Sequence, residues 1–122
     1  MREILFRGKR MDNGEWIEGD LVHSVYKIGD TCVGKFGWTL GMHQVDHYTV
    51  GQYTGLNDKN GKRIFEGDIL SLRTGRPHVV RFEDGAFVLE NTAIPMRFAI
   101  KFEVIGNIHD NPDFMEGAEN GK

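Results

Sequence analysis

The chain has 122 residues, of which 39% are hydrophobic and 27% are charged, and its formal net charge at pH 7 is −3. This length predicts one domain that can bury a core without a metal or a disulfide. The longest apolar stretches are too short to span a bilayer, and the first ten residues lack the apolar region of an export signal, so we expect a cytoplasmic protein. The single cysteine, Cys32, fits a reducing compartment and is expected to be a structural residue.

Charge is unevenly distributed along the chain. Residues 103–122 contain five of the 18 acidic residues but only one of the 15 basic residues, so the body of the protein is close to neutral. Strong sequence-independent binding of nucleic acid needs a basic surface. The overall charge therefore disfavours that activity, although a local basic face is compatible with it.

In the first half of the chain, short strand patterns alternate with turns. Ile4 and Phe6 alternate with their neighbours, Asp12-Asn13-Gly14 is a turn signal, and Glu15–Ile17 resumes the strand pattern. Residues 48–54 are rich in β-branched and aromatic side chains. This composition predicts a further strand there.

The clearest hairpin signal lies in the second half. Asp84-Gly85 is a typical two-residue hairpin turn, and it predicts paired strands over residues 79–89 with Phe82 opposite Phe87. Residues 98–104 alternate apolar and polar side chains, which predicts a half-buried strand. Asn111, as the N-cap of Pro112, predicts a short helix over residues 111–116.

One sequence pattern occurs twice. Asn13-Gly14 is followed by Glu18-Gly19-Asp20 and two aliphatic residues, and Asn60-Gly61 is followed by Glu66-Gly67-Asp68 and two more. A Gly-Asp corner that enters a strand, with an Asp-Gly hairpin downstream, is typical of small SH3-like barrels. We therefore predict an all-β fold of the SH3-like or small-barrel type with an internal repeat.

The domain boundaries follow from these patterns. We predict a single β domain over residues 1–112, with possible halves at residues 1–56 and 57–112. Residues 113–122 are expected to form an acidic, frayed tail.

The repeated acids could carry chemistry. Glu18 and Asp20, like Glu66 and Asp68, are two residues apart, which in a strand places both carboxylates on one side. Such a pair could bind a metal or act as acid and base. The alternative is that each Asp accepts backbone amides in its turn while each Glu is solvated. The occurrence of the pair in both halves favours this structural interpretation.

Two histidines, His43 and His47, would share a face on a helix and could then bind zinc. Their segment is short and lies between glycine and a strand, so we interpret them as a pair of surface-loop histidines. We predict no catalytic residue, no metal and no cofactor, and we expect that the protein is not an enzyme.

Basic residues at the predicted turns are candidates for binding nucleic acid. Together with an exposed aromatic such as Trp16, Trp38 or Tyr53, they could form a face for single strands. The candidates are Arg7, Lys9, Arg10, Lys62, Arg63 and Arg73. The alternative, which we favour, is a solvated rim of mixed charge with the aromatics in the core.

Several segments form a specific pattern over nearly the whole chain. They are Phe6-Arg7, Asn13–Trp16, Thr49–Leu56, Asp58–Gly61, Ile64–Ile69, Val80–Gly85, Glu103–Ile108 and Asn111-Pro112. In these segments the chain resembles the YopX family. It departs from the family where Asp46 is followed by His47-Tyr48 instead of Pro-Glu, and at Gly8-Lys9, where many members carry an aromatic and an acid.

The resemblance implies a bacteriophage or prophage gene product in the bacterial cytoplasm, with a β-rich, barrel-like fold and a homo-oligomeric state. It brings no catalytic residues. We therefore predict a non-enzymatic binding or assembly module whose partner is another copy or a host or phage protein, and no membrane. A small barrel that binds nucleic acid is the alternative, and an enzyme is the least favoured class.

Overall fold

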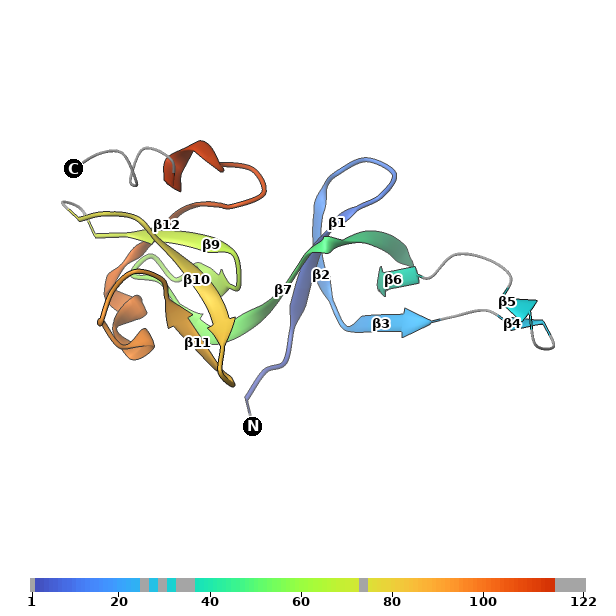
Figure 1. Ribbon diagram of the computed structural model, residues 1–122, viewed down its shortest axis with the longest axis horizontal. Helices are drawn as coiled ribbons and strands as arrows, with labels where there is room; N and C mark the ends of the chain where they lie inside the picture. Colours follow the sequence, from blue (N-terminus) through green and yellow to red (C-terminus); the bar gives the residue numbers. More distant parts are fainter. Residues whose placement is uncertain (1, 25–26, 29–30, 33–36, 73–74, 116–122) are drawn as a thin grey trace. The chain divides into compact units, whose positions relative to one another are not determined.

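The computed structural model describes residues 2–24, 27–28, 31–32, 37–72 and 75–115. Strands make up most of the regular structure in these residues, so the all-β prediction is confirmed (Figure 1). The chain divides into two compact units between Gln52 and Tyr53. The longest strand, β7 (His43–Asn57), runs from the first unit into the second.

The first unit is an antiparallel sheet with the strand order β2-β1-β7-β6-β3. Its strands besides β7 are β1 (Phe6–Arg10), β2 (Trp16–Gly19), β3 (Leu21–Ser24) and β6 (Gly37–Leu40). Two short strands, β4 (Lys27–Ile28) and β5 (Thr31–Cys32), pair with each other. The predicted strands near Phe6, Glu15–Ile17 and residues 48–54 therefore lie in β1, β2 and β7.

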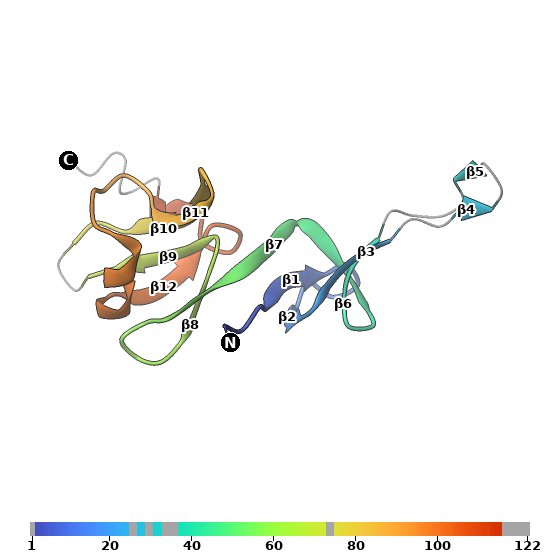
Figure 2. The same ribbon diagram turned by 90° about the horizontal axis from the view of Figure 1, so that it is seen from below.

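The second unit contains a four-stranded antiparallel sheet with the order β11-β10-β9-β12, and Figure 2 shows β10, β9 and β12 side by side. Its elements are β8 (Arg63–Phe65), β9 (Asp68–Ser71), β10 (His78–Glu83), β11 (Ala86–Leu89), the 3-10 helix η1 (Met96–Lys101) and β12 (Glu103–Asn107). Strand β8 pairs with the end of β7, where Tyr53 faces Phe65.

The hairpin predicted at Asp84-Gly85 is confirmed. Phe82 pairs with Phe87, and Val80 with Leu89, in the predicted register. Asp84 and Gly85 have φ values of 51° and 83°, the left-handed conformation that a tight hairpin turn requires.

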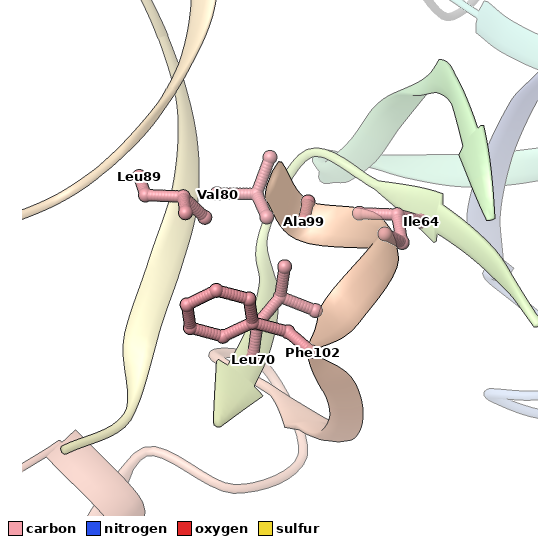
Figure 3. Close-up of a cluster of buried hydrophobic side chains, with 6 residues drawn as sticks. All are labelled: Ile64, Leu70, Val80, Leu89, Ala99 and Phe102. Atoms are coloured by element: carbon pink, nitrogen blue, oxygen red, sulfur yellow. The ribbon is translucent and has the colours of Figure 1, made fainter. Parts of the chain in front are cut away.

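The hydrophobic core of the second unit contains side chains from its strands, from η1 and from Phe102, the residue after η1. Six fully or almost fully buried side chains form one cluster (Figure 3). They are Ile64, Leu70, Val80, Leu89, Ala99 and Phe102. Burial of such aliphatic and aromatic side chains supplies most of the stabilisation of a unit of this size.

The strand predicted over residues 98–104 is wrong in its first part. Residues up to Lys101 belong to η1, and β12 begins at Glu103. Ala99 and Phe102 are buried, whereas Phe98 is 37% exposed. A spacing of three residues places Ala99 and Phe102 on one side of a 3-10 turn, and this burial outweighs the alternating pattern.

The predicted closure into a barrel is absent among the described residues, where each of the two larger sheets is open. Closure requires the outer strands of a sheet to pair with each other. At β12 a turn occupies the outer edge instead. The N–H of Val104 donates to Asp58 Oδ2 at 2.9 Å, and the carbonyl of Phe102 accepts the N–H of Lys59 at 3.0 Å.

The short C-terminal helix predicted over residues 111–116 is present, and its helical residues begin at Asp113, one position after the predicted start at Pro112. The side chain of Asn111, however, accepts the N–H of Asn107 at 3.2 Å, upstream of the helix that it was expected to cap. Residues 116–122, which include most of the predicted frayed tail, lie outside the described residues.

Candidate functional site

The sheet of the first unit has two faces with different side chains. Lys9 pairs with Trp16, whereas the next residue, Arg10, pairs with Val45, which in turn pairs with Trp38. Paired residues point to the same side of a sheet, and consecutive residues point to opposite sides. Trp16 and Lys9 therefore lie on one face, and Trp38, Val45 and Arg10 lie on the other.

On the first face, two of the predicted cations surround Trp16. Cζ of Arg7 lies 4.7 Å, and Nζ of Lys9 lies 5.5 Å, from the centroid of the Trp16 ring. Both distances allow a cation–π interaction. Arg7 is only 9% exposed, so most of its guanidinium is packed against its neighbours.

Arg10, the third predicted cation of this strand, points to the opposite face. Its guanidinium holds Asp12 through two contacts, Nε to Oδ1 at 2.9 Å and a terminal nitrogen to Oδ2 at 2.6 Å. These hydrogen bonds lower the pKa of the Asp12 carboxyl and raise that of Arg10. The pair is exposed, so it contributes little to stability.

The remaining cations lie in the second unit. Lys62 and Arg63 are both exposed at the start of β8, and Cζ of Arg63 lies 5.8 Å from the ring centroid of Tyr53. Arg73 lies outside the described residues. The structure thus brings Arg7 and Lys9 together beside an aromatic, and it places Arg10 on the other face of their strand.

The second face of the first sheet carries four aromatic rings in a row, which we call the aromatic strip. His23 and Trp38 stack at 4.1 Å between centroids and an angle of 10°. Trp38 and His47 are 6.4 Å apart at 26°, and His47 and Tyr48 are 4.0 Å apart at 35°. Tyr48 is 79% exposed, and both histidines are exposed. The strip lies at the surface, and Trp38 is only half-buried.

A bulge in β7 presents one end of the strip. Arg7 of β1 pairs with Gly51, and Lys9 pairs with Asp46, so residues 47–50 lie opposite Gly8 alone. Asp46 Oδ1 accepts the N–H of Tyr48 at 3.1 Å. The buried hydroxyl of Thr49 accepts the N–H of Lys9 at 2.9 Å. Bulges of this kind redirect side chains from the regular alternation of a strand.

One histidine of the strip, His47, belongs to the predicted pair of His43 and His47. His43 and His47 both lie in β7, so the prediction of a loop is wrong, although both side chains are exposed. Among the residues that the structure describes, no three potential metal ligands come together.

The second unit has an aromatic and basic cluster that the sequence interpretation missed. Arg97 Cζ and Lys101 Nζ lie 4.9 Å and 5.6 Å from the ring centroid of Phe98, which η1 exposes. The pattern assigned Phe98 to a buried strand face. The three-residue spacing of the apolar residues Ala99 and Phe102 is the sequence signal that would have predicted an exposed Phe98.

The two Glu-Gly-Asp repeats differ in their use of the aspartate. Asp68 is 1% exposed, and its carboxylate accepts the N–H of Phe65 at 2.8 Å. Asp20 is exposed. The predicted structural role of the aspartate therefore applies to the second repeat.

Asp58 is a second buried carboxylate with a structural role. It accepts three backbone N–H groups, from Asn60 at 2.8 Å and from Lys62 and Val104 at 2.9 Å each. Burial raises the pKa of this carboxyl, but the three amides together outweigh burial and lower the pKa below its ordinary value. The carboxylate thus ties the turn after β7 to β12.

These features define a protein made of antiparallel sheets, with aromatic residues at its surface. The chain belongs to the YopX family, whose pattern, described as YopX protein, matches residues 5–116. Its fold is similar to the crystal structure of protein EF1440 from Enterococcus faecalis, with a TM-score of 0.62 and 23% identity over 94% of this chain and 99% of that chain. No curated protein matches the chain. Within the described residues, no helix has the length and apolar character needed to cross a membrane.

Proposed function

We propose that this chain is a non-enzymatic binding or assembly module of bacteriophage or prophage origin that acts in the bacterial cytoplasm as a homo-oligomer. Its YopX membership supports the phage origin. The use of Asp58 and Asp68 as acceptors for backbone amides supports a structural role for the buried acids. The corner at Gly67-Asp68, followed by the Asp84-Gly85 hairpin, supports kinship of the second unit with SH3-like barrels.

The observation that carries the assembly proposal is an apolar pair beside an open sheet edge. Phe82 is 51% exposed, and its ring meets that of Phe87 edge to face at 5.0 Å. Both belong to the hairpin whose second strand, β11, pairs with β10 alone among the described strands. An unpaired edge next to exposed apolar surface is suited to pairing with a second chain.

Light scattering over a range of concentrations tests self-assembly. The wild-type chain is expected to exceed its monomer mass of 13.9 kDa as concentration rises. Phe82→Glu places a charge at the proposed contact and is expected to restore the monomer. Phe98→Glu, which changes another exposed phenylalanine, serves as the matched control. A monomer mass at every concentration would refute self-assembly.

Nucleic acid is the second candidate partner, and the pairing of Arg7 and Lys9 with Trp16 favours it. A single-stranded oligonucleotide contacted by the Lys9 ammonium and the Trp16 ring of this cluster would bind in part through its phosphates. Affinity should then fall steeply between about 50 and 200 mM salt. Charge reversal at Lys9 should weaken binding, and fluorescence anisotropy measures both effects.

A further inference from the structure

We propose that the aromatic strip binds unpaired bases of single-stranded nucleic acid by stacking. The inference rests on nucleic acid being a partner, and it assigns the contact to the face opposite Trp16. The strip consists of His23, Trp38, His47 and Tyr48.

The first argument is the arrangement of the rings. The four rings already form a pile across β3, β6 and β7, with neighbouring centroids 4.0 to 6.4 Å apart and interplanar angles of 10° to 35°. Tyr48 forms one end of the pile and is 79% exposed. A further flat ring can stack on the exposed end of this row of rings, and every nucleobase has such a ring.

The second argument is that polar contacts within the first unit hold the exposed end in place. Thr49 is 8% exposed, and its hydroxyl donates to the carbonyl of Asp46 at 2.6 Å while accepting the N–H of Lys9. Asp46 Oδ1 in turn accepts the N–H of Tyr48. An ordered bulge fixes the backbone of His47 and Tyr48 before a ligand arrives, which lowers the entropy that binding must overcome.

The third argument distinguishes a base from an apolar protein surface. All four side chains have a ring nitrogen or a hydroxyl that can form hydrogen bonds with the polar edges of a base. The strip contains no carboxylate. Arg10 lies on the same face and in the same row as Trp38, through the pairs Arg10 with Val45 and Val45 with Trp38. Its guanidinium is paired with Asp12, and because that pair is exposed, a phosphate that follows a stacked base can compete with the carboxylate for it.

The chain contains only two tryptophans, which allows a direct test. In the variant Trp16→Phe, Trp38 is the sole tryptophan, and the phenyl ring preserves a partner for Arg7. Titration with single-stranded oligothymidylate is expected to quench the fluorescence of Trp38. A duplex of the same length should quench it far less, because its bases are already stacked.

Substitutions at the end of the strip supply the second readout. Tyr48→Ala is expected to weaken oligothymidylate binding about tenfold, whereas Tyr48→Phe should bind like wild type because the ring is kept. Met42→Ala, at a 97% exposed position in the turn before β7, is the matched control and should bind like wild type. Circular dichroism checks that each variant is folded.

Salt separates this inference from the charge-driven binding considered above. The chain has a net charge of −3, so stacking should dominate, and affinity should fall less than about tenfold between about 50 and 200 mM salt. Binding that is steep in salt and unchanged by Tyr48→Ala would overturn the inference while leaving nucleic acid as a partner. Duplex binding as tight as single-strand binding would also overturn it. Absence of any oligonucleotide binding at low salt would overturn both this inference and nucleic acid as a partner, and would leave the assembly proposal standing.

Discussion

The two Glu-Gly-Asp repeats have the same three residues and different structures. In the second, Gly67 has a φ of 91°, and Asp68 turns inward to bond the N–H of Phe65. In the first, Gly19 is a regular strand residue that pairs with Phe6, and Asp20 is exposed. The same tripeptide thus forms a tight corner in one unit and a simple link between strands in the other.

The surroundings of the glycine explain this difference. In the second unit the N–H of Gly67 donates to Val80 at 2.8 Å, and its carbonyl accepts the N–H of Ile108 at 2.9 Å. These bonds to two separate segments fix the corner. Around Gly19, antiparallel pairing with β1 satisfies an extended backbone instead. Tertiary hydrogen bonding, more than the local residues, therefore selects the conformation.

The largest difference between the repeats is expected on removal of the aspartate. Asp68→Ala leaves the buried N–H of Phe65 without its acceptor and should lower the free energy of unfolding by about 3 kcal/mol. Asp20→Ala, at an exposed position, should change it by less than about 0.5 kcal/mol. Urea denaturation of both variants measures the two effects. Equal losses would contradict the structural distinction between the repeats.

A smaller difference is expected on substitution of the glycine. Gly67→Ala forces a side chain into the left-handed region, where a Cβ would also lie 3.6 Å from Nε2 of His109, and it should cost about 1–2 kcal/mol. Gly19→Ala adds a Cβ whose nearest neighbours are 3.8 and 3.9 Å away, so it should be tolerated. Thermal unfolding compares the two variants, and greater destabilisation by Gly19→Ala would reverse our assignment of the corner.

How far the fold could be predicted depends on the range of the interactions. The Asp84-Gly85 hairpin was predictable in full because its two turn residues fix both conformation and register. Residues 98–101 were not, because Ala99 and Phe102 satisfy a 3-10 spacing only when a core lies beside them. The turn that occupies the outer edge of β12 likewise depends on Asp58, which lies 46 positions away from Val104.

The candidate sites follow the same rule. Arg7, Lys9 and Trp16 could be named together because a short turn joins their strands. The aromatic strip could not, because it requires the pairing of β3, β6 and β7, and also a bulge at Tyr48 that breaks the two-residue alternation. The two-residue periodicity of a strand cannot predict the direction of a side chain that a bulge redirects.

The smallest expected difference between the two units is the effect of low pH on stability through one carboxyl group in each, Asp58 in the second unit and Asp12 in the first. The pKa of Asp58 is lower in the folded chain than its ordinary value of 3.8, so the folded state binds fewer protons there than the unfolded state. The stability that Asp58 contributes is therefore present above about pH 4 and is lost as pH falls through the folded pKa. Asp58→Asn should remove this part of the acid sensitivity.

Asp12 in the first unit provides the comparison, because its pKa is lowered in the same direction by the hydrogen bonds from Arg10. That pair is exposed, so salt should screen any pH dependence it causes, whereas the three backbone amides around Asp58 are insensitive to salt. Urea midpoints measured from pH 6 to pH 2, with and without about 0.5 M salt, separate the two. If Asp58→Asn kept the full acid sensitivity in high salt, the buried carboxylate would not be what distinguishes the second unit from the first.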